Sequence, residues 1–170
     1  MIKIGIDPSG TGTTAIVIYQ DNILLDKKEI INKDWKKHYE FIYDLVDKYY
    51  YADDENHYLI LESCTAIVNI ENCLYTNANG SKDRDDLLRL LGVAEWYFTE
   101  WEIYINWVSP RHTKSVLKNM ENLSKYNDSC LWEFDKDTNL TYEYGKGWKY
   151  NNEKISNHLR DAIIIANYER

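Results

Sequence analysis

The chain has 170 residues, of which 44% are hydrophobic and 28% charged, and it contains only two Pro. This length and composition are typical of one soluble globular domain, and no stretch is long and apolar enough to span a membrane, so we expect a cytoplasmic protein. With 20 Lys and Arg against 28 Asp and Glu, the net charge of -8 excludes a uniformly basic surface. Binding to nucleic acid would therefore depend on local basic clusters or on bound cations.

The first part of the chain predicts three consecutive strands. Residues 2–6 alternate apolar and polar side chains and end at Asp7, after which a Gly-rich turn follows. Residues 14–19 are β-branched and apolar, and residues 23–31 follow them after a tight turn. Because short turns join antiparallel neighbours, we predict a three-strand antiparallel meander.

The rest of the chain alternates between helical and strand patterns. A short, continuously apolar run at residues 58–61 is typical of a strand that is buried on both faces. The other predicted elements are a helix at 34–51, a short helix at 64–76, a loop at 77–82, a helix at 83–101, a strand at 103–108, a helix at 109–120, a loop or loose hairpin at 121–151 and a last helix at 153–168. Residues 1–170 are thus expected to form a single domain, with 121–151 as a variable insertion.

Four side chains form a candidate site at the ends of these elements. Asp7 closes the first strand, Glu62 closes the strand at 58–61, and His158 and Asp161 share one face of the last helix. If the two strands are neighbours and the helix packs over their ends, the four side chains converge. Clustered carboxylates repel one another, and a divalent cation removes that penalty. Carboxylate oxygens suit Mg²⁺ or Mn²⁺, and two such ions can hold both the attacking and the leaving oxygen of a phosphodiester.

Basic residues recur close to this candidate site. Arg111, Lys114 and Lys118 follow one another at helical spacing and predict a basic helix face that contacts DNA. Lys82 and Arg84 border the predicted loop at 77–82 and could contact a second arm of DNA. The alternative for each group is a solvated surface without a partner.

Several motifs resemble those of RuvC-type Holliday junction resolvases, which belong to the ribonuclease H-like superfamily. The segment at 4–13 resembles the first-strand motif, 59–62 the second acidic strand, and 158–162 the C-terminal helix. Residues 90–94 are similar to the long helix of that family, and 108–116 to its next strand and helix. The resemblance covers most of the chain with gaps.

The resemblance implies a fold, an activity and a set of site residues. The fold would be α/β and ribonuclease H-like, with a mixed five-stranded sheet (a three-strand antiparallel meander plus two parallel strands) flanked by helices. The protein would be a homodimer that cleaves four-way junctions and other branched DNA with two Mg²⁺ or Mn²⁺ ions, leaving 5′-phosphate and 3′-hydroxyl ends. Asp7, Glu62, His158 and Asp161 would hold the metal, and Lys114 would meet the region of the scissile phosphate.

The sequence departs from the cellular members of this family in three respects. Residues 63–65 are Ser, Cys and Thr, where those members often have an aromatic residue that wedges into the junction. The segment between Glu62 and the long helix is longer, and 121–151 is additional. These features resemble the bacteriophage branch of the family, whose members would act in the host cytoplasm.

Three alternatives remain open on the sequence alone. A ribonuclease H-like nuclease could act on RNA or on an RNA–DNA hybrid, where it would engage 2′-hydroxyl groups. The Gly-rich turn after Asp7 is also similar to the phosphate-binding turn of an actin-like nucleotide-binding module, although such a module needs a second lobe. A junction-binding scaffold without catalysis is the third alternative.

Overall fold

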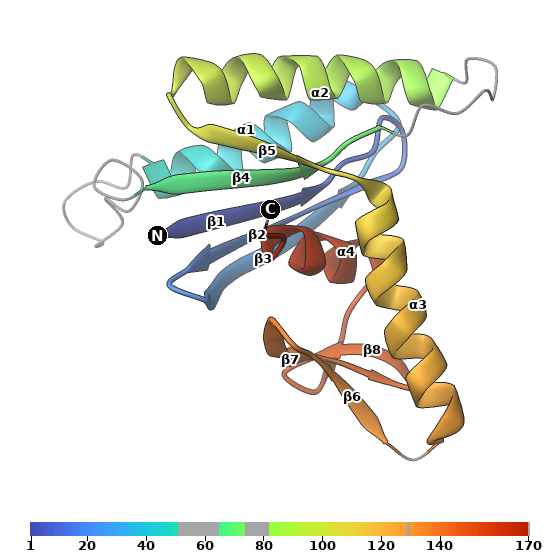
Figure 1. The fold of residues 1–170 in the computed structure, drawn as a ribbon. Coiled ribbons are helices and arrows are strands. Elements are labelled where there is room, and N and C mark those ends of the chain that lie inside the picture. The colour runs from blue at the N-terminus through green and yellow to red at the C-terminus, as the bar shows by residue number, and fades with distance from the viewer. Residues whose placement is uncertain (51–64, 74–81, 129, 170) are drawn as a thin grey trace.

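The computed structural model describes residues 1–50, 65–73, 82–128 and 130–169 (Figure 1). Its elements in chain order are β1 (Ile2–Asp7), β2 (Thr13–Gln20), β3 (Ile23–Ile31), α1 (Trp35–Tyr50), β4 (Ala66–Glu71), α2 (Lys82–Glu100), β5 (Tyr104–Val108), α3 (Pro110–Tyr126), β6 (Leu131–Phe134), β7 (Asp137–Glu143), β8 (Gly147–Tyr150), β9 (Glu153–Lys154) and α4 (Asn157–Ala166).

The larger sheet has five strands in the order β3-β2-β1-β4-β5. The first three strands form the predicted antiparallel meander, and β1, β4 and β5 run parallel to one another. Strand β1 occupies the centre because its apolar side chains Ile2, Ile4 and Ile6 are fully buried. The predicted mixed five-stranded sheet flanked by helices is confirmed.

The strand beside β1 differs from the predicted one. Residues 58–61, which were predicted to form it, lie outside the described residues, and the strand that pairs with β1 is 66–71. Residues 66–71 therefore form a strand, and the short helix that was predicted at 64–76 is wrong for these residues. The polar Asn69 interrupts its apolar pattern, yet Asn69 is only 2% exposed. Its side-chain amide donates hydrogen bonds to main-chain oxygens of Ile165 and Ala166 at 2.9 and 3.0 Å, so α4 supplies the partners that a buried amide requires.

Helices cover both faces of the larger sheet. In Figure 1, α1 and α2 lie above the sheet, and α4 lies against its other face. Helix α4 approaches β1 so closely that a Cβ atom at Gly5 would collide with the main-chain oxygen of Ala162 and with Ala166. This contact fixes the position of α4 relative to the end of β1, where the candidate site lies.

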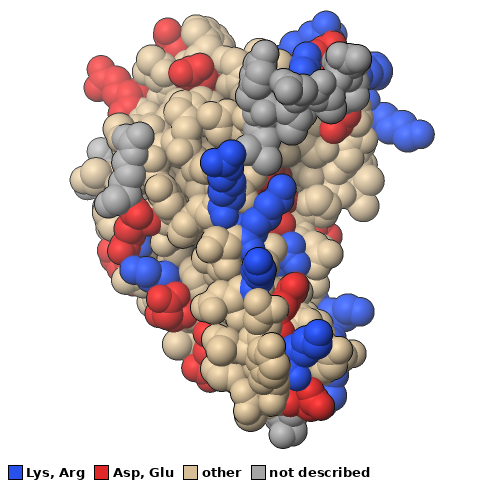
Figure 2. Space-filling model, turned by 45° about the vertical axis from the view of Figure 1, so that its right-hand side comes forward, with Lys and Arg blue, Asp and Glu red and all other residues tan. Residues whose placement is uncertain are grey.

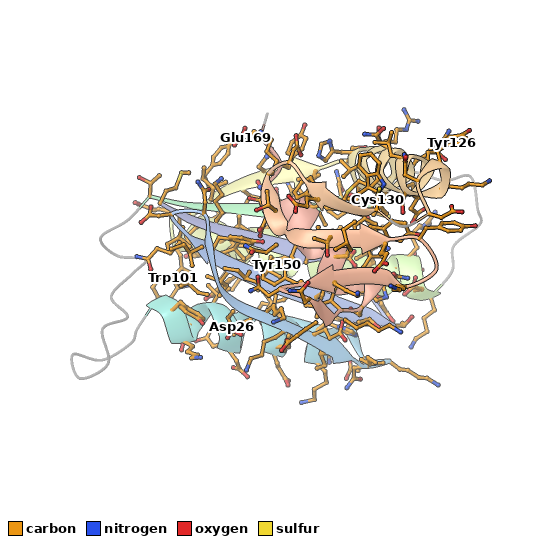
Figure 3. The ribbon with its side chains drawn as sticks, turned by 90° about the horizontal axis from the view of Figure 1, so that it is seen from below. Asp26, Trp101, Tyr126, Cys130, Tyr150 and Glu169 are labelled. Carbon is orange, nitrogen blue, oxygen red and sulfur yellow. The ribbon has the colours of Figure 1, made fainter. Side chains whose placement is uncertain are left out.

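A second, smaller sheet lies below α4. Residues 131–154 form four antiparallel strands in the order β6-β7-β8-β9, where a loop or loose hairpin was predicted, and 153–154 belong to β9 and not to the last helix. Seen from below, this sheet lies in front of the larger one, with Tyr150 between them (Figure 3). The hydroxyls of Tyr19 and Tyr150 both donate to Asp137, at 2.6 and 3.0 Å. A shared apolar core of β2, α4 and the second sheet joins the two sheets.

Among the described residues, no helix is long and apolar enough to cross a membrane.

Candidate active site

Two carboxylates stand side by side at one edge of the larger sheet. Asp7 ends β1 and Glu71 ends β4. The strands are parallel and pair Ile6 with Ile70, so the next residue along each strand is the carboxylate. Asp7 is only 8% exposed. The sheet therefore places a buried and a partly buried carboxyl group next to each other at its carboxyl end, where open α/β sheets place their functional groups.

Helix α4 brings His158 to this pair. The helix begins after Ser156, whose hydroxyl accepts a hydrogen bond from the amide of Leu159 and donates one to Glu29. In the first turn, the Nδ1 atom of His158 lies 2.8 Å from Oδ2 of Asp7. The hydrogen bond to Asp7 raises the pKa of His158 above its usual value, which favours an imidazolium that donates to the carboxylate.

Asp161 lies one turn further along the same helix and completes an acidic cluster with Asp7 and Glu71. Burial raises the pKa of Asp7, and the charge of Asp161 acts in the same direction, while the hydrogen bond from His158 opposes them. Burial also raises the pKa of Glu71 to about 7, with smaller contributions from the charges of Asp7 and Asp161. The three carboxylates therefore repel one another at a partly desolvated site.

Helix α3 supplies two further groups. Ser109 caps its N-terminus and Pro110 occupies the first turn. One turn in, the buried hydroxyl of Thr113 donates a hydrogen bond of 2.8 Å to Oε2 of Glu71. The positive charge of Lys114 opposes the rise in the pKa of Glu71 that burial causes. Lys114 is therefore close enough to act on the cluster electrostatically.

The predicted basic face is present on α3. Arg111, Lys114 and Lys118 are all exposed. In Figure 2, where this side of the molecule comes forward, Lys and Arg side chains form a column with Asp and Glu among them. Because Lys114 acts on Glu71 electrostatically and Arg111 and Lys118 share its helix, a chain of phosphates that reaches the carboxylates could continue along α3.

The other predicted DNA-contacting residues lie at the start of α2. Lys82 pairs with Asp86 at 3.5 Å, and Arg84 pairs with Asp85 at 3.7 Å. The hydroxyl of Thr11 donates to Asp83 at 2.7 Å, which ties the turn after β1 to this helix start. Lys82 and Arg84 therefore lie beside the turn that follows Asp7.

Of the four predicted ligands, the structure brings together Asp7, His158 and Asp161. Glu62 lies outside the described residues, and its predicted place beside Asp7 is taken by Glu71, which the sequence analysis missed. A usable signal existed, since the mostly apolar run at 66–70 is followed directly by an acidic residue, as the run at 58–61 is.

The side chains of the cluster are arranged around protein partners. Within the described ranges, no three His, Cys, Asp or Glu side chains stand in a group that could hold a metal ion. Instead each carboxylate is bonded to a protein donor: Asp7 to His158, Glu71 to Thr113, and Asp161 to Arg160. The donor types nevertheless match a divalent cation, because carboxylate oxygens are hard ligands that suit Mg²⁺ or Mn²⁺.

Comparisons with known proteins identify the fold. No family model and no curated protein sequence matches the chain. The structure is similar to Thermus thermophilus RuvC in complex with a Holliday junction substrate, with a TM-score of 0.58 and 14% identity over 98% of this chain and 90% of that one. It is also similar to another structure of Thermus thermophilus RuvC, with a TM-score of 0.57 and 14% identity over 98% of this chain and 92% of that one. The chain therefore has a RuvC-like fold of the ribonuclease H-like class.

Proposed function

We propose that this protein is a metal-dependent endonuclease that hydrolyses phosphodiesters in four-way junctions and other branched DNA. The observation that carries the proposal is the convergence of Asp7, Glu71 and Asp161, with His158, beside the basic face of α3. The likeness in fold to a RuvC that binds a Holliday junction supports the choice of substrate. The products would carry 5′-phosphate and 3′-hydroxyl ends.

The metal ligands would be the three carboxylates, together with His158. A bound Mg²⁺ or Mn²⁺ would act as a Lewis acid toward the phosphodiester and lower the pKa of a bound water, and two ions are expected. The protein's own contribution is to hold the ligands in place. Thr113 orients Glu71, and the imidazole of His158 orients Asp7.

The substrate would approach along α3. Arg111, Lys114 and Lys118 would contact phosphates, with Lys114 beside the scissile group, and Lys82 and Arg84 would meet a second arm. This local basic face allows an acidic chain of net charge -8 to bind DNA without a uniformly basic surface. We propose further that the active form is a homodimer, because two strands of a junction must be cut, and that the chain belongs to a bacteriophage branch of the family.

A cleavage assay on matched substrates tests the proposal. The protein is incubated with a labelled four-way junction, a linear duplex and an RNA–DNA hybrid, each with Mg²⁺, Mn²⁺ or a chelator. We expect cleavage of the junction in preference to both other substrates, and only with metal. Asp7→Asn should abolish cleavage and leave junction binding intact, whereas Asp44→Asn on the exposed face of α1 should behave as the parent.

Two outcomes contradict the proposal. If the junction is not cut under any metal condition, the protein is not the proposed nuclease. If the hybrid is cut faster than the junction, the enzyme is a nuclease of another substrate class, with the same carboxylates but a different specificity.

A further inference from the structure

Arg160 is a buried charged side chain in direct contact with the candidate site. It is 8% exposed, and it lies between His158 and Asp161 in the first turns of α4. Its Nε and Nη2 atoms each donate a hydrogen bond of 2.9 Å, one to each carboxylate oxygen of Asp161. Its Nη1 atom donates a third, also of 2.9 Å, to the side chain of Asn157. The guanidinium thus forms a bidentate ion pair with Asp161 that holds the carboxylate in one orientation.

A residue of the second sheet also contacts the guanidinium of Arg160. The central carbon of the Arg160 guanidinium lies 5.1 Å from the centre of the Trp148 ring. Trp148 belongs to β8, is 5% exposed, and packs against Tyr142 with 4.8 Å between ring centres. A cation over the face of an indole is attracted to it, most strongly where water is excluded. The small sheet therefore reaches the acidic cluster through the contact between Trp148 and Arg160.

The charge of Arg160 acts on two carboxylates of the cluster, Asp161 and Asp7. Asp161 gains a full counter-charge, and the same guanidinium opposes the rise in the pKa of Asp7 that burial causes. A divalent cation that approaches the carboxylates is repelled by this positive charge. Arg160 therefore has two opposing effects at the site. It orients Asp161, and its positive charge disfavours a metal ion bound beside it.

We propose that Arg160, supported by Trp148, is a positioning residue that orients Asp161 and at the same time lowers the affinity of the carboxylate cluster for divalent cations. The proposal rests on the proposed function, because orientation of Asp161 matters only if that carboxylate serves a reaction. It assigns the second sheet a part in the site. Trp148 of the sheet would keep the guanidinium in place if Asp161 also served as a metal ligand.

Binding of Mn²⁺ to the metal-free protein, measured by calorimetry, separates the two effects from a structural one. Arg160→Gln removes the charge and should tighten Mn²⁺ binding by about tenfold, the size expected for a unit and a double charge several ångström apart in a high effective dielectric. Arg160→Lys keeps the charge and loses the paired hydrogen bonds, so its Mn²⁺ affinity should stay within about threefold of the parent. Lys136→Gln, which removes a charge from an exposed ion pair with Glu169, should leave Mn²⁺ binding unchanged.

Junction cleavage at saturating Mn²⁺ provides the second readout. Both Arg160 variants should cut at least about tenfold more slowly than the parent, with unchanged junction affinity, because Asp161 is no longer held. Trp148→Phe, which keeps a smaller aromatic face, should lower the cleavage rate in the same direction and leave Mn²⁺ affinity near that of the parent.

The outcomes distinguish the failure of each idea. If Arg160→Gln weakens Mn²⁺ binding, or if neither Arg160 variant slows cleavage, the proposal is wrong. If Arg160→Gln does not fold, Arg160→Lys decides, and a parent-like cleavage rate in that variant overturns the proposal. If the parent protein binds Mn²⁺ and Arg160→Gln tightens that binding, while no form cleaves a junction, the effect of Arg160 on cation affinity is supported. The proposed function is then wrong.

Discussion

Substitution of Glu71 by Gln should stabilise the metal-free protein in a pH-dependent way. Burial raises the pKa of Glu71 from 4.5 to about 7, with the charges of Asp7 and Asp161 adding to it. Between these two pH values, the native state holds a proton that the unfolded chain has released, so stability falls as pH rises through this window. The difference corresponds to an upper bound of roughly 3 kcal/mol above pH 7. Gln has a similar shape, cannot ionise, and can still accept the hydrogen bond from Thr113.

Thermal unfolding in the presence of a chelator measures this effect. At pH 8, Glu71→Gln should unfold at a temperature higher than the parent by up to about 10 °C, since roughly 1 kcal/mol moves the midpoint of a chain of this size by about 2–4 °C. At pH 4.5 the two proteins should differ little. Added Mn²⁺ should reverse the order at pH 8, because a ligand that binds only the native state stabilises the parent.

A matched variant and one result complete this test. Glu153→Gln changes an exposed carboxylate on β9 and should show no such pH dependence. If Glu71→Gln lowers the unfolding temperature equally at pH 4.5 and pH 8, then burial and the neighbouring carboxylates do not destabilise the ionised form of Glu71. That result would refute the repulsion between the clustered carboxylates.

Three further predictions concern packing, DNA contact and the second sheet. Gly5→Ala should destabilise the protein by about 1–3 kcal/mol in chemical denaturation, because the added Cβ atom collides with α4. Gly92→Ala, on the open side of α2, should stabilise the protein by about 0.5–1 kcal/mol. Equal effects of the two substitutions would contradict the packing of α4 on β1. Lys114→Ala should weaken junction binding and reduce the slope of log affinity against log salt by about 1, and an unchanged slope would exclude a phosphate contact. Burial, followed by the charge of Asp137, raises the pKa of Tyr150 from 10.0 to about 12, so stability should fall as pH rises through that window. Tyr150→Phe should make the fall smaller without abolishing it, because the pKa of Tyr19 is raised as well.

The larger sheet was predictable except for one strand. Strands β1 to β3 follow β-branched patterns with short turns, and such local signals are sufficient for a meander. Strand β4 was not found because 64–76 was predicted to be a short helix, and the polar Asn69 interrupts the apolar pattern of the strand. The hydrogen bonds that satisfy Asn69 come from main-chain oxygens at the end of α4, almost a hundred residues later in the chain. No local pattern contains that information, although the acidic residue that follows the mostly apolar run at 66–70 was a local signal for Glu71.

The second sheet and its contact with the site depend on partners that are distant in sequence. Asp137 and Tyr150 appear as polar and aromatic residues of a loop until Tyr19 of β2 is placed beside them. The ion pair between Arg160 and Asp161 joins adjacent residues, yet its importance follows from the Trp148 ring behind it. Helical spacing did predict that His158 and Asp161 share a face, and His158 does reach Asp7.

Cleavage of a labelled four-way junction with Mn²⁺ by Glu71→Gln and by Glu62→Gln tests the central claim most directly. The claim is that the carboxylate paired with Asp7 at the end of β4 belongs to the catalytic cluster. We predict that Glu71→Gln binds the junction and does not cut it, while Glu62→Gln cuts at the rate of the parent. Loss of cleavage in Glu62→Gln, with parent-like cleavage in Glu71→Gln, would contradict the claim and return the role to Glu62.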